Sequence, residues 1–99
     1  MDKKQAIEIA GRYKKEISKL IGYSRVYLYG SYSKGTARED SDIDIAIIVP
    51  QLKDNWLVTV KKLWRAGRTV NSLIEPVLIE EGEMSPLYDE IKKWGIAIS

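Results

Sequence analysis

The stretch Tyr29–Val49, YGSYSKGTAREDSDIDIAIIV, decides the fold because it changes character three times in a short span. A glycine-serine turn leads into a mixed-charge loop, and two aspartates then open an apolar run closed by Pro50. Apolar residues at every second position of that run predict a strand with one wholly apolar face and one mixed face. Because side chains two residues apart on a strand point the same way, Asp42 and Asp44 are predicted to share a side.

The segments around this stretch alternate between helical and strand patterns. The predicted elements are a helix over Asp2–Ile21 ended near Gly22, a strand over Val26–Tyr29, a short helix of about Tyr32–Ala37 capped by Ser31, a helix capped by Asp54 and ended near Gly67, a strand over Ser72–Glu80, and a helix from Ser85 and Pro86 that ends before Gly95. Pro76 cannot donate a ladder hydrogen bond, so its strand is expected at a sheet edge or with a bulge there.

This order of elements predicts an α+β fold, in which helices pack on a small mixed β-sheet. The 99 residues leave room for one domain, residues 1–99. The chain has 44% hydrophobic and 30% charged residues, the balance of an ordinary globular domain. The chain is therefore expected to fold as one compact unit.

Composition excludes several kinds of chemistry. Cysteine and histidine are absent, which excludes Cys/His zinc sites, thiol nucleophiles and imidazole bases. The net charge of +2 is too small to indicate nucleic acid, and acids interrupt the basic residues of the first helix, so no direct nucleic-acid partner is expected. No apolar run is long enough for a membrane span, and the cytoplasm is the expected compartment.

Placing Asp42 and Asp44 on the same side of a strand is electrostatically unfavourable, because two neighbouring carboxylates repel each other unless a cation neutralises them. Without sulfur or imidazole ligands, the cation expected is a hard one such as Mg²⁺. Mg²⁺ is usually held by one or two carboxylates, and phosphates and water complete its shell. The pair therefore predicts a substrate that carries phosphate.

Gly30 and Ser31 offer a matching anion site, since glycine allows close backbone approach and a hydroxyl can donate to phosphate. Lys34 or Arg38 is expected to add positive charge. Glu75, an acid in an otherwise apolar run beside Pro76, is the candidate third carboxylate for a two-metal site.

Gly30, Ser31, ten intervening residues and then Asp42, Ile43 and Asp44 match the GSX10DXD signature. The sequence resembles the minimal nucleotidyltransferases (MNT) of the DNA polymerase β superfamily. The resemblance covers nearly the whole chain, including SDIDIAIIV, the acid in IEPVLI and the closing PLYDEIKKWGIAIS. It implies the polymerase β-like nucleotidyltransferase fold.

The resemblance also implies a role for each matching residue. Asp42, Asp44 and Glu75 are the catalytic and metal-binding set, with two Mg²⁺ ions expected, and Glu75 is a candidate base. The nucleotide-binding set consists of Gly30, Ser31, Lys34 and Ser41. Similar short proteins are antitoxins that transfer AMP from ATP to a tyrosine of a HEPN-type RNase toxin encoded beside them.

Two other functions stay open at this point. One is an antitoxin that blocks its partner by contact without catalysis, and the other is a nucleotidyltransferase subunit that acts on a small molecule such as an aminoglycoside. Trp56, Trp64 and Trp94 are expected to pack in the core or at a partner interface, not to stack on bases. The acceptor, the nucleotide preference and a homo- or hetero-oligomeric state are left open by the sequence.

Overall fold

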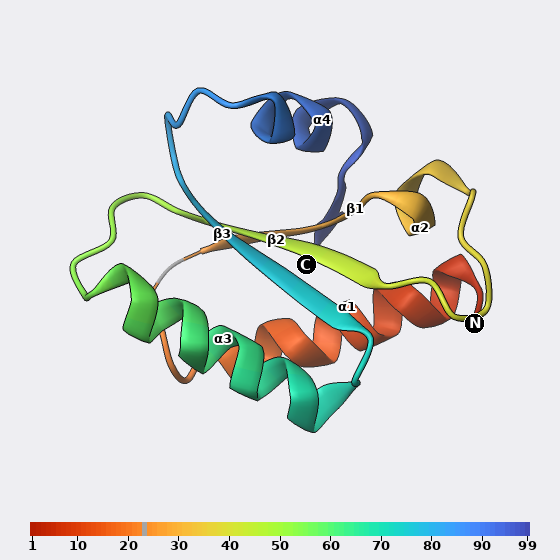
Figure 1. The fold of residues 1–99 in the computed structure, drawn as a ribbon, viewed down its shortest axis with the longest axis horizontal. Coiled ribbons are helices and arrows are strands. Elements are labelled where there is room, and N and C mark those ends of the chain that lie inside the picture. Colours follow the sequence, from red (N-terminus) through yellow and green to blue (C-terminus); the bar gives the residue numbers. More distant parts are fainter. Residues whose placement is uncertain (23) are drawn as a thin grey trace.

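The computed structural model describes residues 1–22 and 24–99. Within them the elements follow the order α1 (Lys3–Ile17), β1 (Arg25–Tyr29), α2 (Ser31–Lys34), β2 (Ile43–Val49), α3 (Trp56–Val70), β3 (Ile74–Glu80), α4 (Pro86–Trp94) and β4 (Ile96–Ile98). The strands form one sheet in the order β3-β2-β1-β4 (Figure 1). The predicted α+β fold with a small mixed sheet is confirmed.

The sheet is mixed because β1 runs antiparallel to β2 and β4, whereas β2 and β3 are parallel. β3 lies at an edge, as expected for a strand that contains Pro76. The strand β4 was not predicted, since three residues carry too little alternation to indicate a strand. Ile96–Ile98 becomes one by pairing with the edge of β1.

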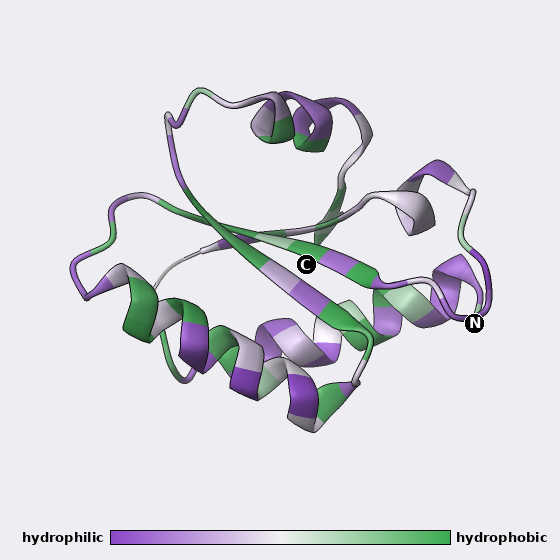
Figure 2. Cartoon of the chain, in the orientation of Figure 1, coloured by the Kyte–Doolittle hydropathy of each residue, from purple (hydrophilic) through white to green (hydrophobic). Residues whose placement is uncertain are grey.

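The helices cover both faces of the sheet, with α1 and α3 on one side and α4 on the other (Figure 1). The alternation in β2 decides which residues meet which helix. Ile43, Ile45 and Ile47 pack in the larger core with α1 and α3, whereas Ala46 and Ile48 pack in a smaller core with α4. Figure 2 shows the apolar colour concentrated on the strands, between helices striped with polar residues. Asp44, two residues before Ala46, therefore belongs to the α4 side.

The helix ends differ from the predicted ones at α1 and α2. α1 starts after Asp2, which forms a capping box with Gln5, but it ends at Ile17 and not at Ile21.

α2 is a single turn whose N-cap is Gly30, so the prediction of Ser31 as the cap is wrong. Gly35 ends this turn in the left-handed conformation, at φ 78°, which explains why the helix does not reach Ala37. In contrast, the predicted cap and first residue of α4 are confirmed.

α3 corrects two further expectations. Its N-cap is Asn55 and not Asp54, and the helix runs through Gly67 to Val70. Gly67 is buried because α3 approaches β3 closely there. A methyl group on Gly67 would lie 3.1 Å from Ile74 Cγ2. This glycine thus serves packing and does not end the helix.

The tryptophans are more exposed than core residues. Trp56, Trp64 and Trp94 keep 42%, 37% and 48% of their surface accessible. Of their two expected roles, packing in the core is therefore wrong. Among the described residues, no helix has the length and apolarity needed to cross a membrane.

The close approach at Gly67 can be tested by Gly67→Leu, with Gly11→Leu as the matched control. Both changes replace a helical glycine with a better helix former, but a side chain on Gly11 meets open space. Overpacking against β3 should lower the free energy of unfolding by about 1–3 kcal/mol at Gly67. The control should be neutral or slightly stabilising in urea unfolding, and equal effects at both sites would contradict the packing role.

Candidate active site

The end of β1 and the beginnings of β2 and β3 meet at one end of the sheet (Figure 1). In the strand register, Tyr29 lies opposite Asp44, and Asp44 lies opposite Glu75. The backbone N–H of Ile43 donates to the carbonyl of Leu73 at 2.8 Å, which ties the two strand starts together. The three side chains Tyr29, Asp44 and Glu75 thus form a row across the strands, and Asp42 directly precedes β2.

The carboxylates of this region perturb one another. Burial is the largest cause that raises the pKa of Asp44 to about 6, and the negative charges of Glu75, Asp42 and Glu90 raise it as well. The pKa of Glu75 is also raised, first by burial and then by the charge of Asp42. The strand register places Asp44 beside Glu75, and a cation bound there would relieve the repulsion between the carboxylates.

The donor set fits a cation that takes only part of its ligands from protein. Within residues 1–22 and 24–99, no three carboxylates are drawn together into a ready metal cage. Mg²⁺ does not need one, because it commonly keeps one or two carboxylates and completes its shell with phosphate and water. Asp42 and Asp44 are the carboxylates that would hold it, and Glu75 lies beside Asp44 in register.

Gly30 brings the turn after β1 against Asp44. Its φ of 72° with ψ of −144° is a conformation that only glycine adopts readily. A Cβ at this position would also collide with Asp44 Oδ2. The glycine predicted for close approach to a ligand therefore also makes room for a carboxylate of the site.

Three other predicted residues lie on the loop and turn beside the carboxylates. Ser31 is the first residue of α2 and is half-buried. The hydroxyl of Ser41 accepts a hydrogen bond from the backbone N–H of Arg38 at 2.7 Å, which stabilises the loop that leads to Asp42. Lys34 pairs with Glu90 of α4, and its Nζ lies 2.5 Å from Glu90 Oε1.

Glu90 is a residue of this region that the sequence did not indicate. Its charge contributes to the raised pKa of Asp44 and to that of Tyr29, which is raised to about 12 mainly by burial. Nothing in the local pattern of α4 separates Glu90 from the neighbouring Asp89. Only the folding of α4 over the sheet brings it near the carboxylates.

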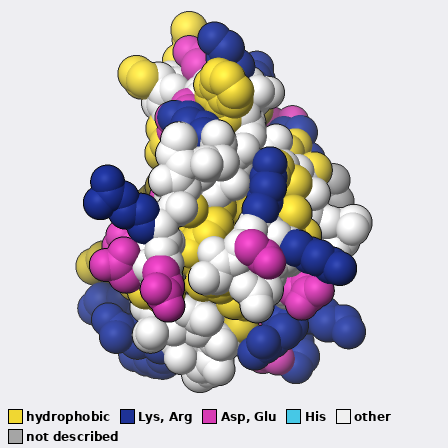
Figure 3. All heavy atoms as spheres, turned by 90° about the vertical axis from the view of Figure 1, so that its right-hand side faces the viewer, with side chains coloured by type: hydrophobic (Ala, Val, Ile, Leu, Met, Phe, Trp, Pro, Cys, Tyr) yellow, Lys and Arg dark blue, Asp and Glu magenta, His cyan; other side chains and the backbone are white. Residues whose placement is uncertain are grey.

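The surface around α2 is electrostatically mixed. Figure 3 shows the molecule from the side on which α2 lies in Figure 1, and acidic and basic side chains are intermingled there with apolar surface between them. A surface that has both positive and negative side chains is complementary in charge to a ligand that carries both phosphate and a divalent cation.

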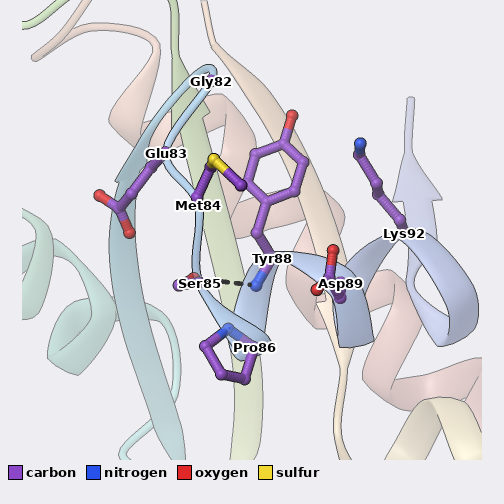
Figure 4. A pocket seen from close by; sticks show the side chains of 8 residues that line it. All are labelled: Gly82, Glu83, Met84, Ser85, Pro86, Tyr88, Asp89 and Lys92. Carbon is purple, nitrogen blue, oxygen red and sulfur yellow. Dashed lines mark hydrogen bonds between the residues drawn. The ribbon is translucent and has the colours of Figure 1, made fainter.

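A hollow in the surface lies apart from the carboxylate row. A hollow of about 450 Å³ lies between the loop after β3 and α4, lined among others by Met84, Tyr88 and Lys92 (Figure 4). Its wall is formed where the hydroxyl of Ser85 accepts from the backbone N–H of Tyr88. No residue of the carboxylate row lines it. Within the row, Glu75 is exposed, whereas Tyr29 and Asp44 are half-buried.

Comparison with known proteins gives three informative relatives. A Methanocaldococcus jannaschii protein named "Putative protein adenylyltransferase MJ0141" is 31% identical over 95% of this chain and 99% of its own length. The protein adenylyltransferase MntA of Shewanella oneidensis is 53% identical, but over only 30% of this chain and 22% of its own. The crystal structure of a toxin–antitoxin with AMP-PNP contains a chain that is 25% identical, with a TM-score of 0.69, over 90% of this chain and 72% of that one.

The family assignment rests on nearly the whole chain. The nucleotidyltransferase domain family matches residues 11–96, a span that includes the turn at Gly30, both aspartates and Glu75. The relative from Methanocaldococcus jannaschii aligns over almost its full length. By this match and by the arrangement of its sheet, the chain belongs to the nucleotidyltransferase domain family, and it is a nucleotidyltransferase enzyme.

Proposed function

We propose that this chain is a Mg²⁺-dependent protein adenylyltransferase, which transfers AMP from ATP to a tyrosine hydroxyl of a HEPN-type RNase toxin and thereby acts as its antitoxin. The observation that carries the proposal is the register pairing of Asp44 with Glu75 beside the turn at Gly30, with Asp42 two residues before Asp44. The names of the two relatives, and the toxin–antitoxin with AMP-PNP, support protein as the acceptor and ATP as the donor.

The proposed reaction is an in-line displacement at the α-phosphorus of ATP. The acceptor oxygen forms a bond to that phosphorus, the bond to the β-phosphate bridging oxygen breaks, and pyrophosphate leaves. The divalent cation supplies charge stabilisation for the phosphates. Asp42 and Asp44 would hold that cation, and Gly30 leaves room for the Asp44 carboxylate beside the turn.

Glu75 is the proposed base that takes the proton of the acceptor hydroxyl. The chain has no histidine, so a carboxylate is the natural candidate. The raised pKa of Glu75 makes it a better proton acceptor than an ordinary glutamate, and its exposed position at the edge strand leaves it accessible to a protein substrate. The exposure of Glu75 agrees with an acceptor delivered by a partner protein.

The first test is transfer of label from α-labelled ATP, in the presence of Mg²⁺, to the product of the neighbouring gene. Asp44→Asn should lower the transfer rate on the order of 100-fold or more, because the cation supplies several kcal/mol of charge stabilisation. Asp54→Asn makes the same change at an exposed aspartate before α3 and should leave transfer intact. Full transfer by Asp44→Asn would exclude the mechanism.

The same assay separates the remaining functions. Tight binding and inhibition of the partner without label on either protein would identify an antitoxin that acts by contact. Label on an added aminoglycoside, with none on protein, would identify transfer to a small molecule.

The close contact of Gly30 with Asp44 predicts the effect of Gly30→Ala. The methyl group would displace the Asp44 carboxylate, so the folded variant should lose most AMP transfer. Gly35→Ala is the control, because Gly35 also has a positive φ but its Cβ would meet open space. Both variants should lose about 1–3 kcal/mol of stability from backbone strain, and only Gly30→Ala should lose activity per folded molecule. Equal AMP transfer per folded molecule by Gly30→Ala and Gly35→Ala would contradict the role of Gly30 in making room for the Asp44 carboxylate.

The raised pKa of Asp44 predicts a pH dependence of stability. Its pKa rises from an ordinary value of 3.8 to about 6, so folding favours the protonated form. The stabilisation is complete below pH 3.8 and is lost as the pH rises through about 6. In chelator, the contribution of Asp44 to thermal stability should therefore fall between pH 4 and pH 7, whereas added Mg²⁺ should restore stability at pH 7.

Asp44→Asn is the control for this titration, since asparagine does not ionise. The difference in melting temperature between wild type and Asp44→Asn should change from pH 4 to pH 7. At pH 4 this difference should be nearly the same with and without Mg²⁺. A constant difference from pH 4 to pH 7 would show that Asp44 is not perturbed in this way.

A further inference from the structure

The ion pair between Lys34 and Glu90 joins two elements that lie far apart in the sequence. Lys34 is the last residue of α2, and Glu90 lies in α4, the helix that covers the carboxylate side of the sheet. Their charged atoms are 2.5 Å apart, and each side chain keeps only about a third of its surface exposed, 35% for Lys34 and 33% for Glu90. At this exposure an ion pair adds little stability, so its main effect is on where the two side chains lie.

Glu90 lies close enough to the active-site row for its charge to be felt there. It contributes to the raised pKa of Asp44 and of Tyr29. The backbone N–H of Lys34 donates to the carbonyl of Gly30 at 3.1 Å, so the ion pair with Glu90 begins one helical turn from the glycine that lies against Asp44. A further carboxylate near Asp44 is costly by itself, and the contact of Glu90 with Lys34 compensates for that cost.

We propose that Glu90 is a positioning residue, which holds the Lys34 ammonium beside the carboxylate row so that it can bind a phosphate group of the nucleotide. The inference rests on the proposed function, because it assigns a nucleotide triphosphate to the same site. An ammonium group has three donors, and Glu90 Oε1 occupies one of them. The other donors can meet phosphate oxygens without breaking the ion pair.

The flexibility of the lysine side chain explains why a positioning residue favours phosphate binding. A lysine side chain loses rotamer entropy when it is fixed, and α2 is a single turn that does little to restrain it. Glu90 makes the lysine ordered before the nucleotide arrives. The cost of ordering is then no longer subtracted from the binding free energy of the phosphate.

Charge alone predicts the opposite effect of removing Glu90. Loss of a negative charge near the site should strengthen binding of the anionic nucleotide by a simple Coulomb argument. Loss of the positioning contact should weaken it. The direction of the change in nucleotide affinity therefore separates the two roles.

The test is equilibrium binding of ATP with Mg²⁺ to the purified full chain, without a partner protein. Glu90→Gln should weaken binding about 3- to 10-fold, the effect of releasing one flexible side chain. Lys34→Met should weaken it at least as much, and the double variant should bind no more weakly than Lys34→Met alone. In the transfer assay, Glu90→Gln should raise KM for ATP and leave kcat nearly unchanged.

Asp89→Asn is the matched control, since it removes the same charge from the adjacent position of α4, where the residue is exposed. This variant should bind ATP as the wild type does or slightly more tightly. Thermal unfolding of each variant checks that the fold is retained.

Unchanged or tighter ATP binding by Glu90→Gln, or additive losses in the double variant, would overturn the positioning role while the proposed function stands. Failure of the wild-type chain to bind ATP at all would overturn the proposed function together with this inference. The two failures are thus distinguishable in one set of titrations.

Discussion

The repulsion between carboxylates on two neighbouring strands is the constraint around which this end of the molecule is built. Asp44 and Glu75 lie at the same register position of β2 and β3, and Asp42 precedes the first of them. The isoleucines on the opposite face of β2 are buried, so the register cannot slip by one residue without turning them to the other side. Core packing thus holds like charges together that would separate in a flexible chain.

The surrounding elements accommodate these charges in different ways. At Gly30 the backbone approaches closely and gives the Asp44 carboxylate the space that a side chain would take. α4 adds a further acid, Glu90, and Lys34 of α2 forms an ion pair with it. A divalent cation and its nucleotide are the proposed partners of the charge that remains. The helix over the site therefore affects both its shape and its electrostatics.

Local patterns were enough to predict most of the fold and the proposed site. Alternation in the run that ends at Val49 predicted the strand and its two faces, and Pro76 predicted an edge position for β3. The errors arose where tertiary contacts override local signals. Gly67 is a typical helix stop in isolation, yet close packing against β3 requires a glycine inside α3. β4 depends on an open sheet edge that no short pattern reveals.

The sequence by itself determined the chemical character of this protein: two aspartates at strand spacing, a glycine-serine turn before them, and no histidine or cysteine to replace them. It could do so because the geometry of a strand relates residues two apart without any knowledge of the fold. The tertiary structure alone decided that Asp44 faces Glu75, and that Glu90 reaches Lys34. These contacts join residues distant in sequence, so they depend on strand order and helix packing, which local spacing does not encode.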